Sequence, residues 1–72
     1  MNTYNILQAI GQRVKTLREG SRLSQDCFAE ICGLNRSYIG SVERGEHNVG
    51  IKNIAAIARG LDVPLYMLFT KK

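Results

Sequence analysis

The spacing of the apolar residues constrains this chain most. Apolar side chains recur every three or four positions, as on one face of an α-helix, and Pro64 is the only proline. No stretch alternates apolar and polar residues over five or more positions with the β-branched content of a strand. The 72 residues leave room for one hydrophobic core and for no enclosed catalytic chamber. The sequence therefore predicts an all-α fold, with residues 1–72 forming a single domain.

Capping residues predict where the helices begin and end. Ser24 and Asn35 are typical N-caps, and Gly33 suits a left-handed helix terminator. Gly60 is expected to end another helix, and Pro64 suits the first position of a last one, where its missing N–H costs nothing. We expect helices over residues 4–19, 25–32, 36–44, 51–60 and 65–69. They predict a compact five-helix bundle.

Residues 25–44 have the pattern of a helix-turn-helix, in which two short helices flank a tight turn. Ala29 is small, as required where the two helices cross closely. Gly33 can adopt the positive φ that the turn needs. The positions that face the rest of the bundle are all apolar: Phe28, Cys32, Leu34, Ile39 and Val42.

The net charge and the spacing of the cysteines and histidine limit the functions that the chain can have. The net charge is +4 and the isoelectric point is near 9.4, which favours an acidic partner such as nucleic acid. Cys27, Cys32 and the single histidine, His47, provide no metal-ligand spacing, and no phosphate loop or catalytic neighbourhood is present. We therefore expect no metal, no cofactor and no enzymatic activity. Lacking a signal sequence and a membrane-length apolar run, the chain is predicted to be cytoplasmic.

The sequence resembles the Cro/CI-type (XRE) helix-turn-helix family, which includes lambdoid phage repressors and restriction–modification controller proteins. The resemblance extends from Ile10 to Phe69, and its run from Asn35 to Asn48 is most similar to the controllers. The matching segments are Arg13–Arg18, Leu23–Gln25, Phe28–Glu30, Gly33–Ile39, Val42–Gly45, Ile51–Ile54 and Gly60–Val63.

This resemblance implies a bacterial or phage-encoded transcriptional regulator with a lambda-repressor-like fold. The third helix of such a protein enters the DNA major groove, and a homodimer binds a pseudo-palindromic operator. The resemblance also implies that Gln25 binds the DNA backbone. It further implies that Arg18 and Glu43 form a structural ion pair beneath the DNA-binding surface.

The outer face of the third helix carries the candidates for base readout. Because Ile39 and Val42 point inward, the opposite face presents Arg36, Ser37, Gly40, Ser41 and Arg44. Arg36 can bind guanine O6 and N7 together, and Ser37 and Ser41 can contact a base at short range. Gly40 either allows close approach of the DNA or occupies an exposed position of no consequence.

Phosphate contacts are expected around this helix, where they would fix its orientation. Tyr38 could instead pack against the fourth helix, but we favour a phosphate contact for its hydroxyl. The helix that begins at residue 51 offers its N-terminal amides as an anion site. The predicted backbone contacts are Gln25, Asn35, Tyr38, Arg44, His47, Asn48 and Lys52.

The last predicted helix is more apolar than a short terminal segment can bury alone, which commonly marks a partner surface. The predicted dimer interface consists of Leu65, Met67, Leu68 and Phe69. Asp26 and Glu30 could contact RNA polymerase, although a helix-dipole complement on a solvated face explains them as well. The alternative function is an antitoxin-like or other protein-interaction module with secondary DNA binding. The sequence leaves the operator and the choice between activator and repressor open.

Overall fold

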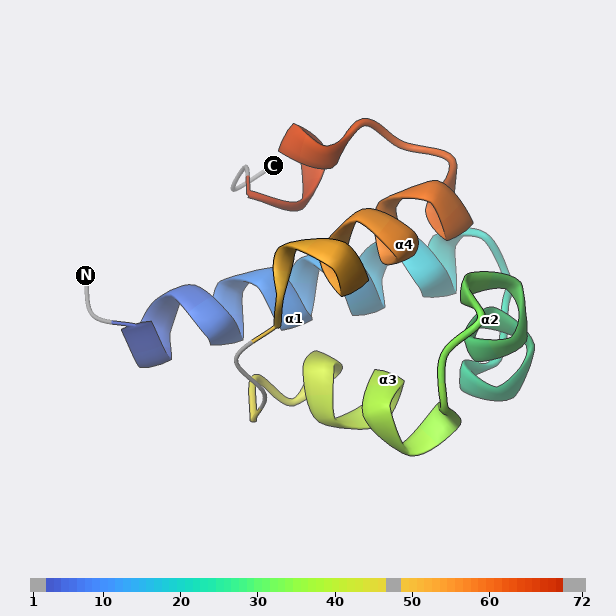
Figure 1. Ribbon diagram of the computed structural model, residues 1–72, viewed down its shortest axis with the longest axis horizontal. Coiled ribbons are helices and arrows are strands. Elements are labelled where there is room, and N and C mark those ends of the chain that lie inside the picture. Colours follow the sequence, from blue (N-terminus) through green and yellow to red (C-terminus); the bar gives the residue numbers. More distant parts are fainter. Residues whose placement is uncertain (1–2, 47–48, 70–72) are drawn as a thin grey trace.

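The computed structural model describes residues 3–46 and 49–69. Its elements are α1 (Thr3–Gly20), α2 (Gln25–Cys32), α3 (Arg36–Glu43), α4 (Ile51–Leu61) and the short 3-10 helix η1 (Leu65–Leu68), with no strand in the described ranges (Figure 1). The all-α prediction is confirmed. The predicted five-helix bundle is matched only in part, because the last segment forms one 3-10 turn and not an α-helix. Pro64 precedes this turn in an extended conformation (ψ 151°), and the Met67 N–H donates to its carbonyl oxygen over 3.0 Å.

The predicted caps of α2 and α3 are present. The Ser24 hydroxyl oxygen accepts a hydrogen bond from the Cys27 N–H over 3.1 Å, and the Asn35 side chain accepts one from the Ser37 N–H over 2.7 Å. Gly33 ends α2 with φ of 73°. These local interactions explain why the bounds of α2 and the start of α3 match the prediction. The end of α3, at Glu43, comes one residue earlier than predicted.

The end of α4 differs from the prediction. The helix continues through Gly60 to Leu61, and Asp62 adopts the left-handed conformation with φ of 58°. A Cβ atom at Gly60 would lie 2.6 Å from the Cys32 sulfur. The glycine therefore permits close packing of α2 against α4 and does not terminate the helix.

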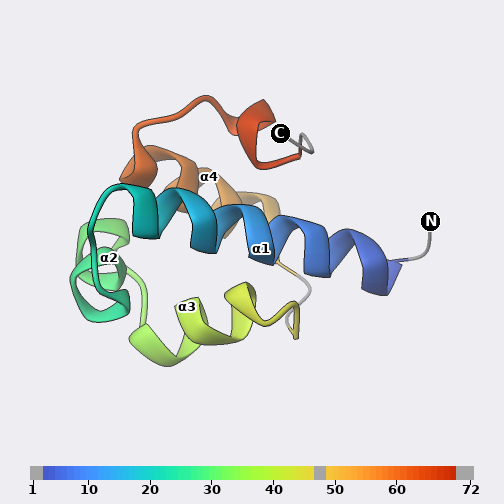
Figure 2. The same cartoon turned by 180° about the vertical axis from the view of Figure 1, so that it is seen from behind.

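The core lies between α1 and the other elements. Figures 1 and 2 show α3 on one side of α1, α4 and η1 on the other, and α2 at one end. A Cβ atom at Gly11 of α1 would lie 2.2 Å from the Val42 carbonyl oxygen, so the α1 and α3 backbones almost touch. The largest fully buried side chains are Phe28, Ile39, Ile57, Leu68, Val14 and Val42.

Residues 3–46 and 49–69 contain neither a membrane-length apolar helix nor a cluster of metal ligands. None of their helices is long and apolar enough to cross a membrane. Within the same ranges, no group of three or more His, Cys, Asp or Glu side chains could hold a metal ion.

Candidate nucleic-acid interface

A buried ion pair fixes the end of α3 against α1. The Arg18 guanidinium donates from Nε to Glu43 Oε2 over 2.6 Å and from Nη2 to Oε1 over 3.1 Å. The third guanidinium nitrogen, Nη1, donates to the Leu23 carbonyl oxygen over 2.6 Å. The hydrogen bond to Glu43 raises the pKa of Arg18 above its ordinary value despite burial. One arginine thus joins α1, the turn before α2 and the last residue of α3.

Gln25 joins the same carboxylate from the first position of α2. Its Nε2 donates to Glu43 Oε1 over 2.9 Å, and its side chain is half-buried. The amide lies over Gly40 of α3, where a Cβ atom would be 3.7 Å from the glutamine Oε1 and 3.1 Å from Arg44 Nη1. Gly40 is therefore buried beneath two side chains, and its predicted position on an exposed face is wrong.

The predicted readout residues lie on the far side of α3 from α1. Arg36 and Ser37 are exposed at its first turn. The Arg36 Nε atom is 3.1 Å from Asp26 Oδ1, in an ion pair whose two side chains are 62% and 76% exposed. Ser41 is half-buried, and its hydroxyl donates to the Ser37 carbonyl oxygen over 3.1 Å. Arg36 and Ser37 are therefore the exposed members of the three, and Arg36 extends a charged side chain that is 62% exposed.

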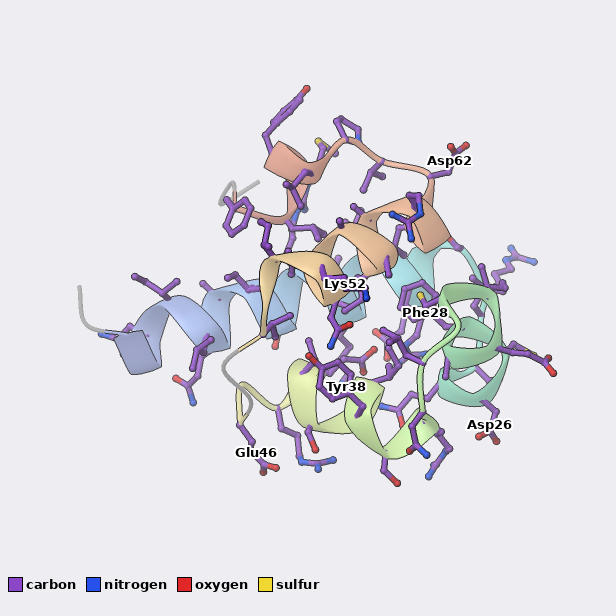
Figure 3. The ribbon with its side chains drawn as sticks, in the orientation of Figure 1. Asp26, Phe28, Tyr38, Glu46, Lys52 and Asp62 are labelled. Atoms are coloured by element: carbon purple, nitrogen blue, oxygen red, sulfur yellow. The ribbon has the colours of Figure 1, made fainter. Side chains whose placement is uncertain are left out.

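Tyr38 faces α4 instead of open solvent. Its ring packs against the core, and its hydroxyl accepts a hydrogen bond from Asn53 Nδ2 over 3.1 Å. The packing against the fourth helix, which the sequence offered as the other possibility, is thus present. Figure 3 shows the ring of Tyr38 on the side of α3 toward α4, with Lys52 projecting from the first turn of α4 in the same view.

The other predicted phosphate contacts are distributed around α3. Asn35 is exposed at the N-cap, and Lys52 is exposed on α4. Arg44 is exposed but forms an ion pair with Glu46, with 3.0 Å between Nε and Oε2. The hydrogen bond to Glu46 raises the pKa of Arg44. His47 and Asn48 lie outside the described residues.

The predicted dimer residues separate in the structure. Leu65 and Met67 are half-buried, and Leu68 is only 1% exposed because it completes the monomer core. Leu68 is therefore unsuited to a surface contact. Phe69 is 54% exposed, and so is Tyr66 at 65%, which the sequence reasoning missed. In a 3-10 helix, which has three residues per turn, Tyr66 and Phe69 are three positions apart and would be expected on one side.

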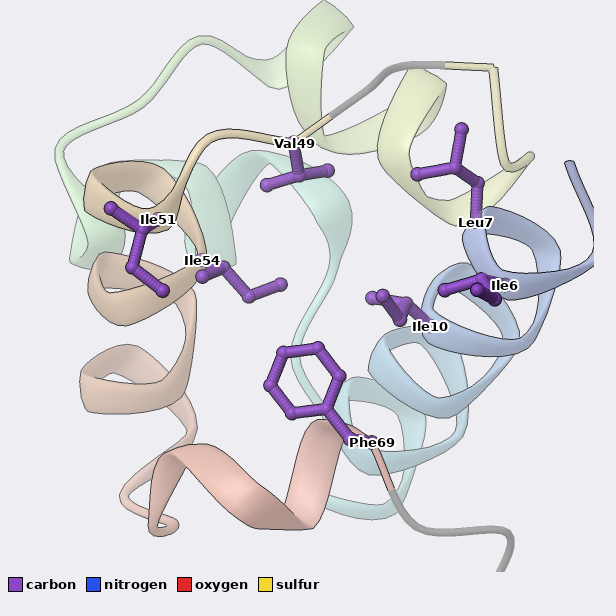
Figure 4. Close-up of a pocket in the computed structure, with 7 residues that line it drawn as sticks. All are labelled: Ile6, Leu7, Ile10, Val49, Ile51, Ile54 and Phe69. Atoms are coloured by element: carbon purple, nitrogen blue, oxygen red, sulfur yellow. The ribbon is translucent and has the colours of Figure 1, made fainter. Parts of the chain in front are cut away.

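Phe69 also lines an apolar pocket of about 270 Å³ between the starts of α1 and α4 (Figure 4). Ile51 on its rim is 71% exposed and Ile6 is 42% exposed. The side chains around it are all apolar: Ile6, Leu7, Ile10, Val49, Ile51, Ile54 and Phe69.

The acidic pair on α2 is on the surface, with Asp26 and Glu30 both exposed. Their contact with RNA polymerase stays a prediction. Asp26 also belongs to the ion pair with Arg36.

Two short capped helices joined at a left-handed glycine, with polar side chains on the outer face of the second, define a DNA-binding helix-turn-helix protein. The model of the Helix-turn-helix family matches residues 14–68, and this chain belongs to that family of DNA-binding transcriptional regulators, which are not enzymes.

Individual relatives agree with this assignment. The chain is 38% identical to the control protein C.SmaI of Serratia marcescens, over 94% of this chain and 81% of that protein. It is 42% identical to the control protein C.BamHI of Bacillus amyloliquefaciens, over 85% and 76%. The crystal structure of the restriction-modification controller protein C.AhdI from Aeromonas hydrophila superposes with a TM-score of 0.86 and 46% identity, over 88% of this chain and 96% of that one.

Proposed function

We propose that this protein is a restriction–modification controller that binds a pseudo-palindromic operator as a homodimer, with α3 in the major groove. The observation that carries the proposal is the outer face of α3, where Arg36 and Ser37 are exposed while Ile39 and Val42 are buried. Similarity to controller proteins along most of both chains supports the particular class. We place its action in the cytoplasm, where bacterial and phage DNA lies.

Base readout in this proposal depends mainly on Arg36. Its guanidinium exchanges the exposed carboxylate of Asp26 for the O6 and N7 atoms of a guanine. An exposed ion pair contributes only about 0–1 kcal/mol, so this exchange costs little. Gln25, Asn35 and Lys52 contact phosphates on either side and set the register of α3.

Arg36→Ala tests this assignment. We expect the variant to lose its preference for the cognate operator over random DNA, while weaker and salt-sensitive binding persists. Competition gel shifts at several salt concentrations measure both quantities. Arg59→Ala is the matched control, because Arg59 is also an exposed arginine but lies in the last turn of α4. Specificity that survives Arg36→Ala, or an equal loss of specificity in Arg59→Ala, would reject the assignment.

We also propose that the homodimer forms through Tyr66 and Phe69 together with the apolar rim beside them. Three exposed apolar side chains line one pocket: Ile6, Ile51 and Phe69. Tyr66 of η1 is exposed as well, and exposed apolar surface of this kind commonly marks a partner surface. Burial of Phe69 against a second copy would remove its ring from water.

Phe69→Glu should therefore shift the protein from dimer to monomer in sedimentation equilibrium. Ile31→Glu is the control, because Ile31 is exposed to a similar extent (56%) but lies on α2. A wild-type protein that is monomeric at micromolar concentration, or a Phe69→Glu variant that stays dimeric, would contradict the interface.

A contact of Asp26 and Glu30 with RNA polymerase is the finer part of this proposal, supported by the exposure of both carboxylates on α2. Glu30→Gln is the cleaner variant, since Asp26 also pairs with Arg36. Transcription in vitro should fall while operator affinity is unchanged.

A further inference from the structure

Three donors converge on the one carboxylate that ends α3. Arg18 donates twice to Glu43, and Gln25 donates the third hydrogen bond to Oε1. The Glu43 side chain is only 3% exposed, so none of these contacts is to a mobile surface group. We propose that Glu43 is a positioning residue for Gln25 and holds the glutamine amide in the orientation that binds a DNA phosphate. This inference rests on the proposed function.

The carboxylate selects one of two amide orientations. A glutamine amide can turn by 180° and exchange its oxygen and nitrogen, and the two orientations differ only through their partners. With Nε2 toward Glu43 a donor meets an acceptor at 2.9 Å. In the flipped orientation two acceptor oxygens would oppose each other next to a buried charge, which is costly. The amide is thus fixed while the protein is still unbound.

Arg18 holds the carboxylate in place. Because the guanidinium binds both carboxylate oxygens and also the Leu23 carbonyl oxygen, Glu43 cannot change rotamer without breaking several hydrogen bonds. The geometry of α1 is in this way transmitted to a side chain on α2. The ion pair therefore has a role in DNA binding besides its role in joining helices.

Gly40 provides the surface on which the amide lies. The position of a Cβ atom there is 3.7 Å from Gln25 Oε1 and 3.9 Å from Nε2, which is ordinary contact distance. A side chain longer than that of alanine would occupy the space of the amide. The glycine thus keeps Gln25 close to α3 and within reach of Glu43.

Orientation before binding matters because an amide has two N–H donors. One is used by Glu43, and among the described residues the second forms no hydrogen bond. A phosphate that meets an already oriented donor does not need to order it, and this lowers the cost of binding. Since Gln25 carries no charge and the buried pair is neutral overall, the effect changes affinity without changing its salt dependence.

A double-mutant cycle in full-length protein tests the inference. Removing Glu43 alone would leave the Arg18 charge buried, at a cost large enough to unfold a small domain. We therefore replace the pair together, as Arg18→Met with Glu43→Leu, which keeps apolar volume and removes the acceptor. Gln25→Ala is combined with both the wild-type and the replaced pair, and operator affinity is measured for all four proteins.

We expect Gln25→Ala to weaken binding about tenfold in the wild-type background, as for one hydrogen bond to a charged acceptor. The replaced pair should weaken binding by a similar factor at an unchanged salt slope. Adding Gln25→Ala to it should cost no more than about twofold. A replaced pair that binds like the wild type, or losses that multiply in the combined variant, would overturn the role of Glu43.

The outcomes separate this inference from the proposed function. If Gln25→Ala has no effect while Arg36→Ala abolishes specificity, the operator-binding function stands and the inference fails. If no variant and not even the wild type binds DNA specifically, the proposed function itself fails.

Nuclear magnetic resonance of the wild-type protein provides a test that does not depend on the replaced pair. The two Nε2 protons of Gln25, assigned by their disappearance in Gln25→Ala, should differ, with one protected from solvent exchange by Glu43. Two protons that exchange alike at the rate of an exposed glutamine would overturn the proposal even if the replaced pair does not fold.

Discussion

Different kinds of contact hold α3 and η1 against the rest of the molecule. The backbone of α3 comes so close to α1 that only glycine fits at position 11, and a buried carboxylate then receives three hydrogen bonds. The η1 segment is held mainly by apolar packing of the buried Leu68 and the half-buried Leu65 against the core. A 3.1 Å hydrogen bond from Arg13 Nε to the Met67 carbonyl oxygen adds to it. Tyr66 and Phe69 beside it are exposed.

The difference separates two kinds of constraint. Directed hydrogen bonds and backbone contact leave α3 one position, which suits the base readout that we propose for this helix. Apolar burial at η1 is not directional, so it fixes the segment with fewer demands on individual residues. We expect substitutions at the α1–α3 contact to lower the free energy of unfolding strongly, and substitutions at η1 to lower it less.

The strongest test of this comparison is Gly11→Val. Its Cβ would overlap the Val42 carbonyl oxygen at 2.2 Å, and neither backbone can yield without moving a whole helix. We expect a loss of more than about 3 kcal/mol, enough to abolish the folded state of a small domain. Urea unfolding followed by circular dichroism measures it.

Gly20→Ala is the control for this test, since a Cβ there has nothing within 4 Å. It should change the free energy of unfolding by no more than about 1 kcal/mol, in the stabilising direction that helix propensity favours. Equal effects of the two substitutions would mean that the α1–α3 approach is looser than described.

A smaller effect is expected at η1 from Arg13→Met. The substitution keeps an apolar stem and removes the hydrogen bond to Met67, so the loss should be about 0.5–1.5 kcal/mol. Lys15→Met on the exposed face of α1 is the matched control. If Arg13→Met lowered the free energy of unfolding as much as Gly11→Val, the contacts of α3 and η1 would not differ in the way described above.

The smallest expected effect is on the ionisation of the two cysteines of α2, one on its exposed face and one on its inner face. Burial raises the pKa of the Cys32 thiol to about 11, an effect that Arg59 partly opposes, whereas Cys27 is exposed. At pH 8 only about one Cys32 in a thousand is then a thiolate. Iodoacetamide followed by mass spectrometry should label Cys27 first.

The same shift predicts a pH dependence of stability. Because the folded protein holds the Cys32 proton more tightly than the unfolded chain, the contribution is complete below the ordinary thiol value of 9.0 and is lost as the pH rises toward about 11. Cys32→Ala should flatten the decline in stability across this window. An unchanged pH profile would mean that the thiol is more accessible than its contacts indicate.

Sequence reasoning located the elements whose ends depend on local hydrogen bonds. Three residues act within their own turn and determine both ends of α2 and the start of α3: Ser24, Gly33 and Asn35. The ion pair of Arg18 with Glu43 was implied by family resemblance, and the structure places the two side chains together.

Features that depend on distant contacts were not accessible in this way. Gly60 resembles a helix terminator in sequence, yet the structure requires a glycine there because a side chain would collide with the Cys32 sulfur of α2. Gly40 resembles an exposed position, yet Gln25 and Arg44 cover it. Leu68 is buried and Phe69 is exposed because the segment forms a 3-10 turn. A small change in the helical pitch would exchange which residues face inward and which face outward.

The backbone contact at Gly11 also determines which partner adapts during recognition. Because no side chain lies between α1 and the Val42 carbonyl oxygen, no change of rotamer can let α3 slide or tilt. We expect the helix to meet the groove as a rigid body. If the two half-sites of an operator do not match the spacing of two rigid α3 helices, the DNA has to bend or twist. The stiffness of base pairs that the protein does not touch would then contribute to operator choice.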